Sequence, residues 1–423
     1  MSTDTFVFRG NDLYCEGSQV TQIAREFGTP LYVYSKNHIL DRCRTMKRAL
    51  GEIPHLVCYA LKANSNPSLL ALIREEGIGA EVVSGGELYG ALKYGFPPER
   101  IIFSGVGKRD DEIELALEKK IFALNVESLE ELKTISELAR RRGIRAPIFF
   151  RVNPDIEAGG HPYISTGRKH DKFGVEPHDV VEAFRWAKNE QSLDCIGLHA
   201  HIGSQVVSVE PYRAAAQMIV GLARSLQQEG MKLRAVNMGG GFGVRYADVV
   251  CDPRLPAGAV QETVPSAHEF LAAVLPLYRA LGCTVLCEPG RAIVANAGAL
   301  IVRVLYRKQT AGRTFVVVDG GMNDLIRPTL YQAYHQIVPV EISGRGSGVV
   351  DIVGPICESG DFFALERSMP NVVRGDYLAI LTTGAYGYVF SSNYNGRPRG
   401  AEVLVDDREV SVIRQREKVE NLI

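Results

Sequence analysis

The sequence predicts an α/β protein with a (β/α)8 barrel, or TIM barrel, and a C-terminal, mostly antiparallel β domain. Between residues 55 and 290, short apolar runs alternate with amphipathic helical patterns. After Arg291, β-rich runs separated by Gly, Asn and Pro replace the helical patterns. A chain of 423 residues is also too long for one ordinary hydrophobic core, so two domains are expected.

The barrel rests on a count of apolar runs. They lie at residues 55–61, 79–84, 100–105, 122–127, 146–153, 193–202, 232–239 and 283–288. Helical patterns between them include 87–94, 111–120, 128–142, 211–228 and 267–281. Eight evenly spaced units favour a closed barrel, with a doubly wound open sheet as the alternative.

The β domain is predicted from runs at 299–306, 314–319, 349–353 and 402–405. Runs at 5–9 and 31–34 near the N-terminus are also strand-like, and we expect this segment to join the β domain. The predicted parts are therefore an N-terminal segment 1–35, a barrel 36–292 and a β domain 293–423.

Composition and charge exclude several classes of partner. The net charge is −1, which does not favour a nucleic-acid-binding surface. No apolar run approaches the roughly 20 residues of a membrane span, and the N-terminus lacks the features of a signal peptide. The eight cysteines include no CxxC pair, which predicts free thiols in a reducing cytoplasm.

Unusual residues follow the predicted barrel strands, where the reacting groups of such barrels gather. Lys62 follows the first run, and its position is the most informative. A lysine next to a buried strand is costly unless it is solvated, paired or covalently used. Burial favours a neutral amine, which can form a Schiff base with a carbonyl such as that of pyridoxal phosphate (PLP). The alternative is a lysine that reaches solvent or a carboxylate.

Glycines follow the seventh run, at Gly239-Gly240-Gly241. Their backbone amides could approach a phosphate, although a plain turn is an equal alternative. Their spacing matches neither a dinucleotide-binding nor a nucleotide-binding loop. Ser204 and Arg291 could add a hydroxyl and a guanidinium to the same phosphate.

Glu288 ends the eighth run. It could pair with Arg291, or it could face a pyridine nitrogen and keep that nitrogen protonated. His199 and His201 are two residues apart and would share one face of a strand. Zinc would need a third ligand of suitable spacing, which is not evident. We therefore predict no metal and expect one imidazole to stack on an aromatic cofactor.

Together these residues resemble the PLP-dependent family of ornithine, arginine and diaminopimelate decarboxylases. The resemblance runs from about residue 20 to 420. The motifs that carry it are Tyr59-Ala-Leu-Lys-Ala-Asn64, Val82-Val-Ser-Gly-Gly-Glu-Leu88, His199-Ala-His-Ile-Gly-Ser-Gln205, Gly239-Gly-Gly-Phe-Gly243, Cys287-Glu-Pro-Gly-Arg291, Cys357-Glu-Ser359 and Gly384-Ala-Tyr-Gly387.

The resemblance assigns roles to individual residues. It implies that Lys62 carries PLP as a Schiff base, that His201 stacks on the ring and that Glu288 meets the pyridine nitrogen. The remaining cofactor-binding residues, chiefly around the phosphate, would be Ser204, Gly240, Gly241, Gly290, Arg291 and Tyr386. One departure is Glu81, which stands where the family more often has Asp.

The resemblance also implies a homodimer with shared active sites, in which Cys357 and Glu358 come from the partner subunit. Cys357 would return a proton to the substrate; its alternative role is that of a small buried hydrophobe. Glu358 would bind a distal ammonium group.

The substrate is predicted from the far end of the site, where Arg327 and Tyr331 could hold a distal carboxylate, with Arg291 and Tyr386 also contacting substrate. A surface salt bridge is the alternative for Arg327. Segments 161–167 and 172–174 are also typical of the diaminopimelate branch.

The function that follows is decarboxylation of meso-2,6-diaminopimelate to L-lysine, the last step of lysine biosynthesis. The rival substrates are ornithine, arginine, D-lysine and carboxynorspermidine. A catalytically silent PLP-binding relative would need lesions in the motifs, and none is present. Glu288 disfavours a racemase.

Overall fold

The eight apolar runs form a closed parallel barrel in the computed structural model, which describes residues 5–159, 161–256 and 263–422. The strand order around the barrel is β10-β11-β12-β5-β6-β7-β8-β9. The strands are β5 (His55–Ala60), β6 (Gly79–Val82), β7 (Ile101–Phe103), β8 (Ala123–Val126), β9 (Ala146–Arg151), β10 (Leu193–His199), β11 (Ala235–Asn237) and β12 (Thr284–Cys287). Closure confirms the barrel and excludes the open sheet.

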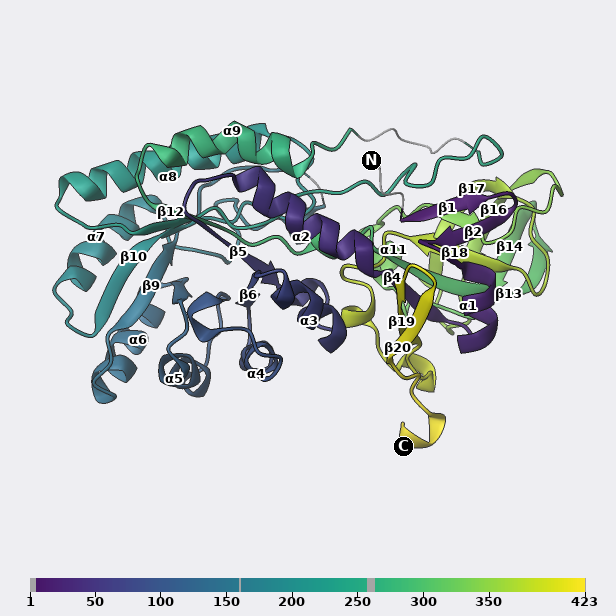
Figure 1. The fold of residues 1–423 in the computed structure, drawn as a ribbon, viewed down its shortest axis with the longest axis horizontal. Helices are drawn as coiled ribbons and strands as arrows, with labels where there is room; N and C mark the ends of the chain where they lie inside the picture. The colour runs from purple at the N-terminus through teal and green to yellow at the C-terminus, as the bar shows by residue number, and fades with distance from the viewer. Residues whose placement is uncertain (1–4, 160, 257–262, 423) are drawn as a thin grey trace.

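Helices cover the outside of the barrel (Figure 1). They are α2 (Lys36–Leu50), α3 (Pro67–Glu75), α4 (Gly85–Lys93), α5 (Asp110–Lys119), α6 (Leu129–Arg141), α7 (Pro177–Lys188), α8 (Glu210–Gln228) and α9 (Ala267–Arg279). Side-chain caps explain where several begin: Ser84, Ser128 and Ser266 each accept a backbone N–H from the third residue of the following helix.

Two apolar clusters hold the barrel together. Strand side chains such as Leu56, Ile102, Phe149 and Leu286 form a cluster separate from the main core, as expected for side chains that fill a barrel interior. Residues on the other face of the strands, such as Val57, pack with the helices in the main core.

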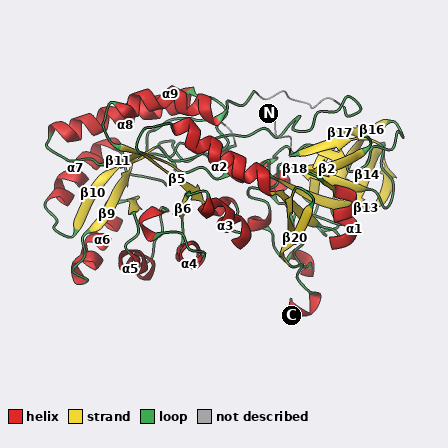
Figure 2. Cartoon of the chain, in the orientation of Figure 1, coloured by secondary structure: helices red, strands yellow, loops and turns green. Residues whose placement is uncertain are grey.

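The second sheet confirms the mostly antiparallel β domain (Figure 2). It has nine strands, in the order β17-β16-β14-β13-β4-β19-β20, with β18 paired to β13 and β15. The strands are β4 (Leu31–Ser35), β13 (Gly298–Thr310), β14 (Arg313–Val318), β15 (Ile337–Pro339), β16 (Ser347–Val353), β17 (Phe362–Pro370), β18 (Tyr377–Leu381), β19 (Ala401–Asp406) and β20 (Glu409–Arg414). The short helix α10 (Arg291–Val294) lies between β12 and β13, and the short helix α11 (Arg327–Tyr331) lies between β14 and β15.

The N-terminal segment lies against the C-terminal strands, as the purple and green ribbons of Figure 1 show. As predicted, β4 joins the large sheet, where it pairs with β13 and β19. The run at 5–9 instead enters a separate three-stranded sheet of β1 (Phe6–Arg9), β2 (Asp12–Cys15) and β3 (Ser18–Gln19). Helix α1 (Val20–Phe27) follows it. The exact domain boundaries stay a prediction.

The structure also bears on the cysteines and on the question of membrane-spanning helices. All eight cysteines are free thiols. In the described part of the chain, no helix combines the length and apolar character that crossing a membrane requires.

Candidate active site

One cavity at the C-terminal ends of the barrel strands brings together most of the predicted site residues. Those that line it are Lys62, His201, Ser204, Gly241, Glu288, Gly290, Arg291, Arg327, Tyr331 and Tyr386. They come from both the barrel and the β domain, so the cavity lies where the two meet. Gly240, Cys357 and Glu358 do not line it.

Lys62 lies on the short 3₁₀ turn Leu61–Ala63 directly after β5. Its Nζ atom is 2.9 and 2.8 Å from the two carboxylate oxygens of Glu81, which is buried on β6. Burial acts to lower the pKa of Lys62, but the Glu81 carboxylate outweighs it, and the pKa is raised. The expectation that burial leaves this amine neutral is therefore wrong. The amine must therefore lose a proton before it can react, and the Glu81 carboxylate lies within hydrogen-bond distance of it.

Glu288 lies just after β12 with only 6 % of its surface exposed. Asn237 donates a hydrogen bond of 2.7 Å to its Oε1 atom, and His199 Nε2 lies 3.3 Å from its Oε2 atom. Burial alone would raise the pKa of Glu288, but His199 and Lys62 lower it. The side chain is thus an ionised carboxylate inside the barrel mouth.

The two histidines have different environments. His199 contacts Glu288, whereas His201 lines the cavity. The backbone N–H of Gly240 donates to His201 Nδ1 at 3.0 Å. Burial, followed by the charges of Arg151 and Lys62, lowers the pKa of His201. A neutral imidazole of fixed orientation therefore faces the cavity. The same hydrogen bond uses the Gly240 amide that was predicted to bind phosphate.

Arg291 forms the centre of a candidate anion site. Its Nη2 atom donates to Ser204 Oγ at 2.8 Å, and its guanidinium carbon lies 4.8 Å from the ring centroid of Tyr386. Its Nε atom is buried without a hydrogen-bond partner among the described residues. Gly241 lies on the same wall with φ +93°, and a Cβ atom there would lie 2.1 Å from the carbonyl oxygen of Gly203. Only glycine fits this close approach.

Arg327, on α11, is the second buried arginine of the cavity, with 5 % of its surface exposed. It is hydrogen-bonded to His335 Nε2 at 2.8 Å, and its Nε atom lacks a partner within the described structure. Burial lowers the pKa of Arg327. The alternative of a surface salt bridge is excluded by this burial. Tyr331, one turn further along α11, also lines the cavity.

Cys357 and Glu358 are exposed and lie outside the cavity of their own chain. The Cys357 backbone N–H donates to Asn395 Oδ1 at 2.8 Å. The alternative of Cys357 as a small buried hydrophobe is therefore wrong.

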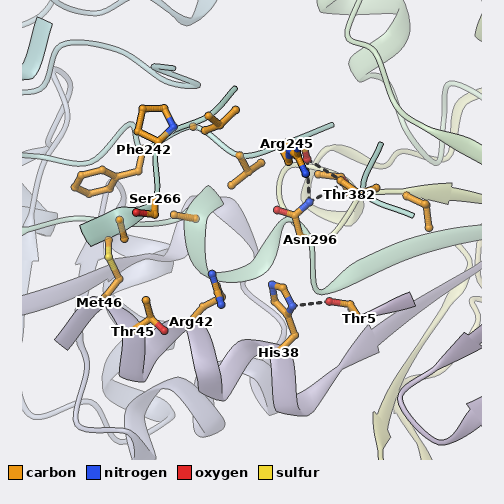
Figure 3. Close-up of a pocket in the computed structure, with 18 of the residues that line it drawn as sticks. Thr5, His38, Arg42, Thr45, Met46, Phe242, Arg245, Ser266, Asn296 and Thr382 are labelled. Carbon is orange, nitrogen blue, oxygen red and sulfur yellow. Dashed lines mark hydrogen bonds between the residues drawn. The ribbon is translucent and has the colours of Figure 1, made fainter. Parts of the chain in front are cut away.

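A second cavity lies between the N-terminal strand, α2 and the start of α9 (Figure 3). Thr5, His38, Arg42, Asn296 and Thr382 are among its polar lining residues, and Thr5 Oγ1 is hydrogen-bonded to His38 Nδ1. None of the residues predicted for catalysis or cofactor binding lines it. This cavity is therefore separate from the candidate active site.

Sequence reasoning missed several site residues. Asn237 orients Glu288, and its position at the end of β11 could have identified it. Tyr246 and His335 contact Arg291 and Arg327 from segments without strand-end signals, so no local pattern identifies them.

The residues present fit PLP by their chemistry. Lys62 offers an amine to the cavity, and Glu288 offers an ionised carboxylate for a pyridine nitrogen. Arg291 and Ser204 offer donors for a phosphate, and the unpartnered Nε atom of Arg291 shows that its donor capacity is not used within the described chain.

Comparisons with known proteins agree with this assignment. Residues 36–295 match the family model of the pyridoxal-dependent decarboxylases, pyridoxal binding domain. The diaminopimelate decarboxylase of Aquifex aeolicus is 44% identical over 98% of this chain and 96% of its own length. That of Pseudomonas aeruginosa is 43% identical over 99% of this chain and 98% of its own. The crystal structure of the Helicobacter pylori diaminopimelate decarboxylase, complexed with L-lysine, superposes with a TM-score of 0.89 at 43% identity, covering 95% of this chain and 98% of that one. The chain therefore belongs to the pyridoxal-dependent decarboxylases, as its motifs predicted, and its cofactor is pyridoxal phosphate.

Proposed function

We propose that this protein decarboxylates meso-2,6-diaminopimelate to L-lysine and carbon dioxide, the last step of lysine biosynthesis. Relatives at 43–44% identity over nearly the whole chain bear the name of that activity. By reaction class the enzyme would be a carbon–carbon lyase, specifically a carboxy-lyase.

The observation that carries the proposal is the pair of buried arginines, Arg291 and Arg327. Both line the cavity that contains Lys62. Among the described residues, neither forms an ion pair with a carboxylate. An unpaired buried charge is costly, so each arginine is explained best by an anion on the ligand. The cofactor phosphate accounts for Arg291, and a distal carboxylate accounts for Arg327.

This arrangement separates diaminopimelate from the rival substrates. Ornithine, arginine, D-lysine and carboxynorspermidine have no second carboxylate beyond the one that is lost. Arg327 would remain uncompensated with any of them bound. Tyr331, on the same helix, can add a hydroxyl to the distal group.

The chain's residues divide the chemistry between them. When bound, PLP supplies an electron sink for the electron pair left at Cα as carbon dioxide departs. Lys62 would hold the cofactor through its side-chain amine, which lines the cavity. Glu288 would keep a proton on the pyridine nitrogen, and the neutral His201 would offer an imidazole face to the ring. Glu81, hydrogen-bonded to Lys62 Nζ, is placed to hold the proton that this amine must lose.

The product also needs a proton at the carbon that loses carbon dioxide. We infer that Cys357 supplies it from a second copy of the chain, with Glu358 binding the distal ammonium. Both residues are exposed in the single chain, which leaves them available to a partner. The functional unit would be a homodimer with shared active sites.

We also place the enzyme in the cytoplasm, because its eight cysteines are free thiols. The proposed domain boundaries remain 1–35, 36–292 and 293–423. In support, the matched family region begins at residue 36 and ends at 295.

Product analysis tests the substrate. The purified protein with PLP is given meso-diaminopimelate, L-ornithine or L-arginine in separate reactions. Lysine and carbon dioxide from diaminopimelate alone are expected. Turnover of ornithine or arginine instead would contradict the role of Arg327, and PLP binding without any turnover would indicate a silent relative.

Mixing of two inactive variants tests the shared site. Lys62→Ala and Cys357→Ala dimers are unfolded together and refolded, so that hybrid dimers form. A hybrid contains one site with both residues intact. Random pairing makes about half of the dimers hybrids, so the mixture should recover about a quarter of the wild-type activity. No recovery above the separate variants would contradict sharing between subunits.

A further inference from the structure

A buried carboxylate outside the cavity connects the β domain to the loop of the reactive lysine. Glu402, on β19, is fully buried. Its Oε1 atom accepts a hydrogen bond of 2.6 Å from Tyr34 Oη. Its Oε2 atom accepts one of 2.8 Å from Asn66 Nδ2 and another from Arg414 Nε. Three donors thus satisfy a charge that would otherwise be very costly to bury.

Asn66 transmits this contact to the site. Its Oδ1 atom caps α3 by accepting the Ser68 N–H at 3.0 Å, so its amide group must face Glu402. Its own backbone N–H donates to Asn64 Oδ1 at 3.0 Å. Asn64 Nδ2 in turn donates to the carbonyl oxygen of Gly384 at 3.0 Å. Every polar group in this chain of contacts has one fixed direction.

The far end of the network contains two groups of the cavity. Lys62 precedes Asn64 on the same turn, and the Ala63 carbonyl oxygen accepts the N–H of Tyr386 at 2.8 Å. Tyr386 has φ +56°, a conformation that a tyrosine adopts only when its surroundings impose it. The loops 61–66 and 384–386 are therefore joined to each other, and Glu402 anchors one end of them.

We propose that Glu402 is a positioning residue for Lys62: from the β domain it fixes, through Asn66, the loop that presents the reactive amine. The inference rests on the proposed function for its turnover assay. Glu402 does not line the cavity, and its hydrogen bond with Asn66 is the contact that leads to the loop of Lys62.

The proposal can be tested by moving the negative charge from residue 402 to residue 66 in two steps. Asn66→Asp still caps α3, but it cannot donate to Glu402 and brings two carboxylates together. We expect kcat to fall about 10- to 100-fold, as displacement of a reacting group by about 1 Å does, with a smaller change in KM. We also expect faster loss of PLP on dialysis. Adding Glu402→Gln restores the original net charge and a donor toward residue 66, although the new amide nitrogen cannot accept from Arg414 Nε. The double variant should therefore recover part of both properties.

Two further variants separate positioning from general damage. Asn66→Ser keeps a good cap for α3 but is too short to reach Glu402. It should therefore also lower kcat and PLP retention, here without any charge repulsion. This variant tests the proposal even if Asn66→Asp does not fold. Asp406→Asn is the matched control, because it breaks the 2.6 Å Lys36–Asp406 ion pair between α2 and the same strand. It should leave kcat and PLP retention unchanged.

Normal kcat and PLP retention in Asn66→Ser would overturn the proposal, as would a double variant no better than Asn66→Asp. If the wild-type protein does not turn over diaminopimelate, the proposed function fails. PLP retention still decides the role of Glu402 in that case, because it requires no substrate.

Discussion

Replacement of Arg327 by methionine separates the activity of the enzyme from its stability. Arg327→Met keeps most of the apolar stem but removes the guanidinium. A hydrogen bond to a charged group contributes about 1.5–3 kcal/mol, which corresponds to a fall of roughly 10- to 150-fold in kcat/KM for diaminopimelate. The charge removed is buried and, among the described side chains, unpaired with any carboxylate. Relief of this buried charge offsets the hydrogen bond lost at His335, so the free energy of unfolding without ligand should change by less than about 1 kcal/mol.

Arg367→Met is the matched control. The guanidinium carbon of Arg367 lies 4.0 Å from the ring centroid of Tyr334, and its Nη1 atom donates to the carbonyl oxygen of His335 at 2.8 Å. Arg367 does not line the cavity. We expect kcat/KM to stay within about threefold of wild type, while the lost hydrogen bond reduces stability by about 1 kcal/mol.

The assays are initial-rate kinetics over a range of diaminopimelate concentrations and denaturant unfolding of the PLP-free protein. The two variants should show opposite patterns, one losing activity and the other losing stability. If Arg327→Met keeps wild-type kcat/KM, the distal carboxylate is bound elsewhere. If it loses activity and stability together, its effect is structural and the reasoning from an unpaired charge is refuted.

Three other changes have defined outcomes. Lys62→Ala should abolish both the absorbance of protein-bound PLP and turnover; normal turnover would refute the covalent role. Cys357→Ala should keep bound PLP but slow product formation about 100-fold or more, the range expected for a lost general acid, and an unchanged rate would require another donor. His38 has its pKa lowered to about 4, chiefly by burial, so the native state should lose up to about 3 kcal/mol as pH falls from 6.5 to 4. Denaturant unfolding at several pH values should show a weaker dependence in His38→Gln, and an identical slope would contradict the assignment.

The sequence was sufficient for the barrel because local patterns define it. Each strand is a short apolar run, and reacting groups such as Lys62 and Glu288 follow directly after their runs. Caps such as Ser84 and Ser266 have similarly local signals. The three-stranded N-terminal sheet was less predictable, since β2 and β3 are short and partly exposed.

Long-range contacts account for what the sequence could not predict. Glu81 is 19 residues from Lys62, and the sign of its effect on the pKa of that lysine depends on the 2.8 Å distance between them. Glu402 is 336 residues from Asn66. No periodicity in either segment reveals such a pair. The hydrogen bond from the Gly240 amide to His201 likewise depends on how the loops after β10 and β11 meet.

The position of β4 has a consequence for how the chain reaches its native state. Leu31 pairs with Ile301 on one side and with Ala401 on the other. During synthesis, this strand must therefore wait for both partners until almost the whole chain has emerged. The barrel can assemble earlier, because its strands follow one another along the chain. High contact order in the last sheet should make its closure the slow step. A ribosome-bound chain truncated before β19 should then expose β4 to proteases while the barrel is already protected.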